Sequence, residues 1–138
     1  MPSGSIQIAK QLALFLANKP GMLIEVCEVL AKAKINIYAI CTSDTIDHSV
    51  VRLIVDNPKK ALALFEEYGT LVVENEVIMI EGSNKPGSLS SIATLLAKNK
   101  VNIEYAYCAT SPNAKQGLLI LRPSQVAKAL KVLNTRTS

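Results

Sequence analysis

The residues Asn-Lys-Pro-Gly-X-Leu occur twice in this chain, at Asn18 to Leu23 and at Asn84 to Leu89. An asparagine side chain carries an oxygen acceptor, which suits an α-ammonium group, together with amide donors. A glycine before a helix lets a ligand approach the free N–H groups of the first turn, where a partial positive charge favours a carboxylate or phosphate. The pair of features fits a free amino acid better than a phosphate. The alternative is that each copy is only a turn with helix-start chemistry.

The two copies lie 66 residues apart, and the same spacing recurs downstream. Leu30-Ala31-Lys32 returns as Leu96-Ala97-Lys98, and Leu53-Ile54 returns as Leu119-Ile120. The last recurrence pairs Ala61, Ala63 and Leu64 with Ala127, Ala129 and Leu130. The sequence therefore predicts a duplicated module whose copies align without a gap.

A second recurring pair follows the predicted helix of each copy, as Asn36-Ile37 and Asn102-Ile103. An asparagine after a helix is commonly a cap or turn residue. The same segment could instead face a partner's loop and complete a pocket. Tyr105 and Tyr107, two residues apart, share one face of a predicted strand and would either line a pocket or be buried.

Apolar periodicity gives the elements that position these residues. Alternation predicts a strand over 6–16, and Pro20-Gly21 ends it. The first half continues with a helix ending near Lys34, strands at 35–42 and 50–55, a helix over 58–68 and a short strand at 70–74. In the strand at 35–42, we expect Ile35, Ile37, Ala39 and Cys41 to face inward. The second half predicts a strand at 77–81, a helix over 88–98, strands at 101–109 and 118–121, and a helix over 124–133.

Each half thus has the order β-α-β-β-α-β, except that no last strand remains for the second half. We expect an α+β fold of two ferredoxin-like units, residues 1–74 and 75–138, with antiparallel sheets side by side and helices on one face. We predict that Ile6 and Ile8, in the segment Ser5 to Ala9, supply the missing strand, in the same chain or a neighbouring one. The alternative is that they only lengthen the first strand.

Composition excludes several classes of protein. No apolar run approaches the ~20 residues that span a membrane, and Met1 to Gly4 lacks the features of a signal peptide. Three well-separated cysteines favour a reduced, cytoplasmic protein. Cys27 lies on an apolar helix face, and we expect it in the core. A net charge of +4, with no aromatic residues on the central strands, does not predict nucleic-acid binding. We expect no metal or cofactor, because the single histidine, His48, lies in a polar loop.

The two copies of Asn-Lys-Pro-Gly-X-Leu, each followed by a helix, Asn-Ile and a strand, resemble a tandem ACT-domain protein. ACT domains are small regulatory modules of β-α-β-β-α-β fold that bind amino acids. The resemblance covers almost the whole chain and implies no attached enzyme. The missing last strand departs from the family pattern.

The resemblance further implies a ligand site between adjacent units, formed by the loop of one unit and the helix–strand region of the other. One site would contain Asn18, Gly21, Met22 and Leu23, with Asn102 and Ile103 opposite. The other would contain Asn84, Gly87, Ser88 and Leu89, with Asn36 and Ile37 opposite.

The sequence and this resemblance together predict a non-enzymatic amino-acid sensor. We expect a homodimer or higher homo-oligomer that regulates an amino-acid-pathway enzyme. The alternatives are a structural interaction module without a ligand and a small enzyme with a site between the units.

Overall fold

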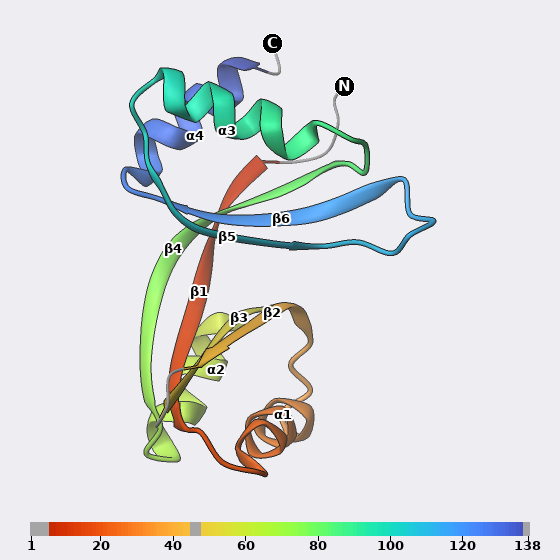
Figure 1. Cartoon of the computed structure of the whole chain (residues 1–138). Helices are drawn as coiled ribbons and strands as arrows, with labels where there is room; N and C mark the ends of the chain where they lie inside the picture. The colour runs from red at the N-terminus through yellow and green to blue at the C-terminus, as the bar shows by residue number, and fades with distance from the viewer. Residues whose placement is uncertain (1–5, 45–47, 137–138) are drawn as a thin grey trace. The chain divides into compact units, whose positions relative to one another are not determined.

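The computed structural model describes residues 6–44 and 48–136, which form six strands and four helices. In chain order these elements are β1 (Ile6–Ala17), α1 (Met22–Lys32), β2 (Ile37–Asp44), β3 (His48–Val55), α2 (Pro58–Glu67), β4 (Leu71–Ser83), α3 (Ser88–Lys98), β5 (Ile103–Ala109), β6 (Gln116–Pro123) and α4 (Val126–Arg136). Figure 1 shows them along the chain.

Contacts divide the chain into two units. Lys10–Asn75 form the first unit, and residues 6–9 together with 76–136 form the second. The strand order is β2-β3-β1-β4 in the first unit and β5-β6-β4-β1 in the second. Numbered within its own repeat, each order is second, third, first, fourth, which is the ferredoxin-like arrangement. The predicted α+β, ferredoxin-like class is therefore confirmed.

The fourth strand of the second unit comes from the start of the chain. The beginning of β1 adjoins β4, and Ile6 packs against the core of the second unit. Ile8 is 39% exposed, so only one of the two isoleucines contributes to that core. Residues 6–9 thus group with the second unit and not with the range 1–74 in which the sequence analysis placed them.

The segments 70–74 and 77–81, expected as two short strands, form the single strand β4 of 13 residues. Glu74-Asn75-Glu76 contains no glycine or proline, so nothing in the backbone chemistry interrupts the strand. The two repeats therefore share a strand at their boundary.

The core of the first unit lies between the inner faces of α1 and α2 and one face of the strands. Apolar residues at alternate strand positions meet apolar residues at helical spacing. Its buried members are Leu12, Leu14, Leu16, Val26, Leu30, Ile35, Val51, Leu53, Val55, Ala61 and Phe65.

The core of the second unit repeats this pattern under α3 and α4, which lie on the same side of β5 and β6 in Figure 1. Its buried members are Ile78, Ile80, Ile92, Leu96, Val101, Leu119, Leu121, Ala129 and Leu133.

The expected gap-free alignment of the repeats is wrong after the β5–β6 hairpin. Cys41 pairs with Arg52, whereas Tyr107 pairs with Ile120. Cys41 and Tyr107 are 66 residues apart, whereas their partners Arg52 and Ile120 are 68 residues apart. The β5–β6 hairpin is therefore two residues longer than the β2–β3 hairpin. From there on the structural counterpart of Leu53 is Leu121, and that of Ala61 is Ala129 rather than Ala127.

The inward alternation expected for 35–42 is also interrupted. The register of β2 against β3 shifts between Ile37 and Ala39, as does that of β5 against β6 between Ile103 and Tyr105. Ile37 packs on the core under the helices. Beyond the bulge, Ala39 and Cys41 pair with Ile54 and Arg52, on the opposite face.

Helices α1 and α3 are each followed, two residues after the last helical residue, by a lysine with left-handed backbone geometry. Lys34 has φ 59° and Lys100 has φ 61°. The next N–H groups, of Ile35 and Val101, each bond at 2.9 Å to a carbonyl five residues back. This is the Schellman motif, in which a glycine usually holds the left-handed position.

Candidate functional site

Each repeated loop leads directly into a helix. Gly21 precedes α1 with φ 90°, and Gly87 precedes α3 with φ 87°. L-residues adopt this left-handed geometry at a cost, so the turn itself requires glycine. A Cβ built on either glycine meets nothing within 4 Å. The backbone geometry, and not close contact with a neighbouring group, therefore accounts for both glycines.

The starts of α1 and α3 differ from that of α2. Asn57 caps α2, its side chain accepting a hydrogen bond from the Lys60 N–H. Among the described residues, no side chain caps α1 or α3 in this way. The Ser88 N–H at the start of α3 donates to the Lys85 carbonyl at 3.2 Å, and the remaining first-turn N–H groups of α1 and α3 point toward the space before each helix.

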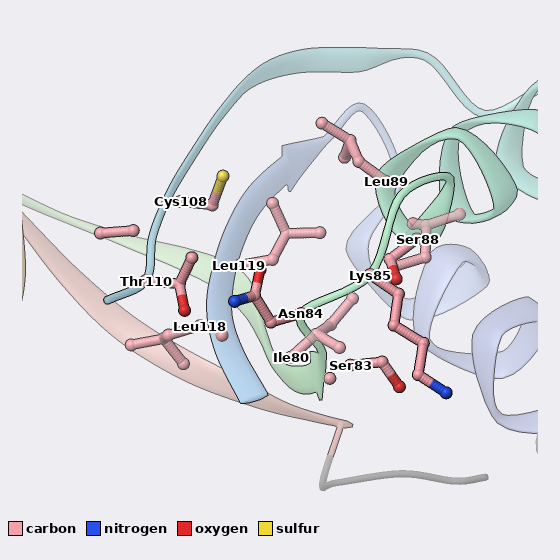
Figure 2. Close-up of a pocket in the computed structure, with 14 residues that line it drawn as sticks. Ile80, Ser83, Asn84, Lys85, Ser88, Leu89, Cys108, Thr110, Leu118 and Leu119 are labelled. Atoms are coloured by element: carbon pink, nitrogen blue, oxygen red, sulfur yellow. The ribbon is translucent and has the colours of Figure 1, made fainter. Parts of the chain in front are cut away.

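A cavity of about 170 Å³ lies in the second unit, between the β4–α3 loop and the β5–β6 hairpin. Figure 2 shows Ser88 and Leu89 on the helix side of this cavity, with Cys108 and Thr110 across from them. Its lining residues are Ile80, Gly82, Ser83, Asn84, Lys85, Ser88, Leu89, Ile92, Cys108, Ala109, Thr110, Gly117, Leu118 and Leu119. We call it the second cavity.

Hydrogen bonds from Asn84 join the β4–α3 loop to the β5–β6 hairpin, on the two sides of the second cavity. Its Nδ2 donates to the Ala114 carbonyl at 2.9 Å and, more weakly, to the Ser111 carbonyl at 3.5 Å. Its backbone N–H donates to the Lys115 carbonyl at 3.0 Å. The amide donors of Asn84 therefore hold the hairpin, and the side-chain oxygen is the group left to accept from a ligand.

An equivalent cavity of about 250 Å³ lies in the first unit, and we call it the first cavity. Its lining residues are Leu16, Ala17, Asn18, Lys19, Met22, Leu23, Thr42, Ser43, Asp44, Ser49 and Val51. With the two-residue insertion taken into account, the counterpart of each of these residues lines the second cavity. The repeated loop thus forms a hollow at the same place in both units.

The sequence model of the family described as ACT domain pair matches residues 7–137. The chain belongs to this family. Among solved structures, protein BT0572 from Bacteroides thetaiotaomicron is similar at 36% identity and a TM-score of 0.89, over 95% of this chain and 90% of that one.

The ACT pair also resembles more distant solved structures. The regulatory subunit of aspartate kinase from Thermus thermophilus is 18% identical, with a TM-score of 0.72 over 99% of both chains. The corresponding subunit from Thermus flavus is 19% identical, with a TM-score of 0.65 over 97% of this chain and 96% of that one. At these identities the likeness shows the shared fold. No protein with a curated description matches the chain.

Six of the residues expected at the ligand sites line the cavities. Asn18, Met22 and Leu23 line the first, and Asn84, Ser88 and Leu89 line the second. Leu23 and Leu89 are 44% and 48% exposed, unusually high for leucines on the apolar side of a helix. Gly21 and Gly87 stand at the adjoining helix starts.

The other four expected residues lie away from these cavities, at the opposite ends of β2 and β5. The backbone N–H of Asn36 donates to Asp56 Oδ1 at 3.1 Å, and that of Asn102 donates to Ser124 Oγ at 3.2 Å. Ile37 and Ile103 pack against the two cores. Within its own unit, each Asn-Ile pair has the geometry of a turn that enters a strand.

Sequence reasoning missed the hairpin side of each cavity, including Thr42, Cys108 and Thr110. It also missed Gly82, whose counterpart in the aligned repeat is Leu16. Glycine at position 82, where the first repeat has leucine, was the sequence signal that could have identified this residue.

Tyr105 and Tyr107 do share a face, as expected, but it is the face away from the helices, opposite Arg122 and Ile120. Both are partly buried, and neither lines the second cavity. Cys27 is likewise only partly buried, although its place on the apolar helix face predicted a core residue. Within the described part of the chain, no helix is long and apolar enough to cross a membrane.

Proposed function

We propose that this ACT pair is a regulatory sensor that binds a free amino acid next to the repeated Asn-Lys-Pro-Gly loops. The observation that carries the proposal is the recurrence of one cavity at both loops, with each lining position of the first matched in the second. A plain turn would need no such hollow beside it.

The groups around the cavity mouths suit the two charged ends of an amino acid. A carboxylate would accept from the uncapped N–H groups at the start of α1 or α3. Lys85 in the second cavity and Lys19 in the first add a positive charge. The side-chain oxygen of Asn84 would accept from the α-ammonium group.

Binding would act by changing the balance between conformations or assemblies, since a ligand shifts an equilibrium only through its different affinities for the states. Solved structures similar to this chain include regulatory subunits of aspartate kinase. We propose an amino-acid-pathway enzyme as the regulated partner, in a cytoplasmic setting, with this chain acting as a homodimer or higher homo-oligomer without catalysis of its own.

The test is a titration of ligand-free protein with each of the twenty amino acids, followed by calorimetry and thermal melting. An amino acid at 100 times its dissociation constant should add about 2.7 kcal/mol to the free energy of unfolding. The D-enantiomer of any active amino acid is the control. If neither heat nor a raised melting temperature appears with any of the twenty, the loops are only turns.

A further inference from the structure

The two cavities differ on the side that faces the core of each unit, which we call the floor. Gly82 in β4 is the counterpart of Leu16 in β1, whose side chain is 6% exposed and part of the first core. In the first unit the side chain of that leucine lines the cavity. In the second unit the glycine leaves this position without a side chain.

The second cavity consequently extends further into the core of its unit. Ile80 and Ile92, both core residues, line it, whereas their counterparts Leu14 and Val26 do not line the first cavity, which meets its own core at Leu16 and Val51. Its volume of about 170 Å³ is close to that of an engineered apolar cavity, of roughly 150 Å³, that binds benzene. A floor of this kind favours an apolar group and penalises a charged one.

The two cavities also differ in the acidic residues near their openings. Asp44 lines the first cavity, and Thr110 takes its place in the second. Helix α1 has Glu25 in its first turn, whereas α3 has no acidic residue there, all of its residues being among those described. The negative charges of Asp44 and Glu25 both disfavour binding of a carboxylate at the start of α1.

We propose that the second cavity is the single ligand site of each chain, and that it selects an amino acid with an apolar side chain. The side chain would occupy the space above Gly82, with the α-carboxylate at the start of α3. This inference rests on the proposed function and adds to it the site, the stoichiometry and the class of ligand.

Calorimetry with L-valine, L-leucine, L-isoleucine, L-methionine and L-phenylalanine, compared with L-aspartate, L-lysine and L-serine, tests the class and the stoichiometry. We expect one bound molecule per chain and a preference of about tenfold or more for an apolar amino acid, as differences of a few apolar groups produce. Two molecules per chain, or a preference for a polar amino acid, would overturn the inference while leaving the proposed function intact. Absence of binding by all twenty amino acids would instead overturn the proposed function itself.

The variant Gly82→Leu tests the site by restoring the residue of the first unit. A Cβ at position 82 meets only the Ile80 side chain, at 3.8 Å, so the backbone accepts it. The rest of the leucine should fill the floor and weaken binding about tenfold or more, as overpacking does. The matched control is Glu81→Leu, one residue earlier and exposed, which should bind as the parent does. Unchanged affinity in folded Gly82→Leu would contradict the proposal.

Cys108 provides a readout in the unaltered protein, because it is exposed and lines the second cavity. Thr42 stands at the same place in the first cavity, so no thiol there competes. A saturating apolar amino acid should slow alkylation of Cys108 by iodoacetamide several-fold and leave that of Cys41 unchanged. Equal alkylation of Cys108 with and without a bound amino acid would place the ligand elsewhere, whether or not Gly82→Leu folds.

Discussion

The side-chain amide of Asn84 donates a 2.9 Å hydrogen bond to the carbonyl of Ala114, thirty residues further along the chain. This bond joins the loop that leads into α3 to the β5–β6 hairpin, the two walls of the second cavity. The hairpin carries the two residues by which the second repeat exceeds the first. Asn84 therefore fixes the part of the site where the repeats differ in length.

Asn84→Asp should destabilise the second unit, because a carboxylate would face the carbonyls of Ala114 and Ser111 in place of a donor. Asn84→Ala should cost about 0.5–1.5 kcal/mol, the usual value of a hydrogen bond, and the aspartate at least as much. Urea denaturation measures the loss, and hydrogen exchange at residues 111–115 should speed up. Asn113→Asp introduces the same charge in the hairpin, at a side chain without a hydrogen bond among the described residues, and should change stability little. Equal losses from both aspartates would point to charge alone.

Gly87→Val should destabilise the protein by about 1–3 kcal/mol, because a β-branched residue is forced into left-handed geometry at φ 87°. Gly21→Val should behave alike. Gly87→Asn is the control, since asparagine tolerates this geometry better. Chemical denaturation distinguishes the two. A valine variant as stable as the asparagine variant would mean that the turn can change its conformation freely.

Each valine variant should also weaken any ligand bound at its own helix start, because a branched side chain crowds the backbone donors there. Calorimetry on the folded variants measures this. If Gly21→Val and Gly87→Val together leave the affinity unchanged, the loops do not contact the ligand.

Lys34→Gly and Lys100→Gly should each stabilise the protein by about 0.5–1 kcal/mol. The left-handed backbone costs an L-residue roughly 1–2 kcal/mol, and the greater freedom of glycine in the unfolded chain cancels part of that gain. The preceding residue, Ala33, has φ −86°, so Ala33→Gly should destabilise instead. Midpoints of urea denaturation should move in opposite directions for Lys34→Gly and Ala33→Gly, and movement in the same direction would refute the explanation.

Ile6→Ala should lower stability by about 1–2 kcal/mol, less than the roughly 2–5 kcal/mol of a fully buried position, because Ile6 is only partly buried on the second core. Ile8→Ala is its matched control and should stay within about 0.5 kcal/mol, since Ile8 is exposed. Thermal melting should show a shift of a few degrees for the first variant only.

Deletion of residues 2–9 removes the whole of this strand segment and should lower the melting temperature by several degrees or alter the oligomeric state. Sedimentation velocity follows the second effect. A deletion variant that melts and sediments like the parent would show that the segment merely extends β1.

Much of the fold was predictable because each repeat contains clear turn residues and a regular apolar spacing. Pro20-Gly21 and Pro86-Gly87 mark the turns before α1 and α3, and apolar spacing marks which helix faces lie on the cores. The missing last strand of the second repeat, with a spare apolar segment at Ile6, likewise predicted the strand that the start of the chain supplies.

The sequence by itself determined the duplication, the ferredoxin-like class and one wall of each cavity, because these depend on local turn chemistry and periodicity. Only the tertiary structure revealed the two extra residues of the β5–β6 hairpin. Side chains alternate along a strand, so a shift of two residues keeps every side chain on its face and leaves the apolar pattern intact. Leu53 therefore aligned with Leu119 in the sequence although its counterpart is Leu121. The hairpin wall of each cavity could emerge only once the strands were paired in register.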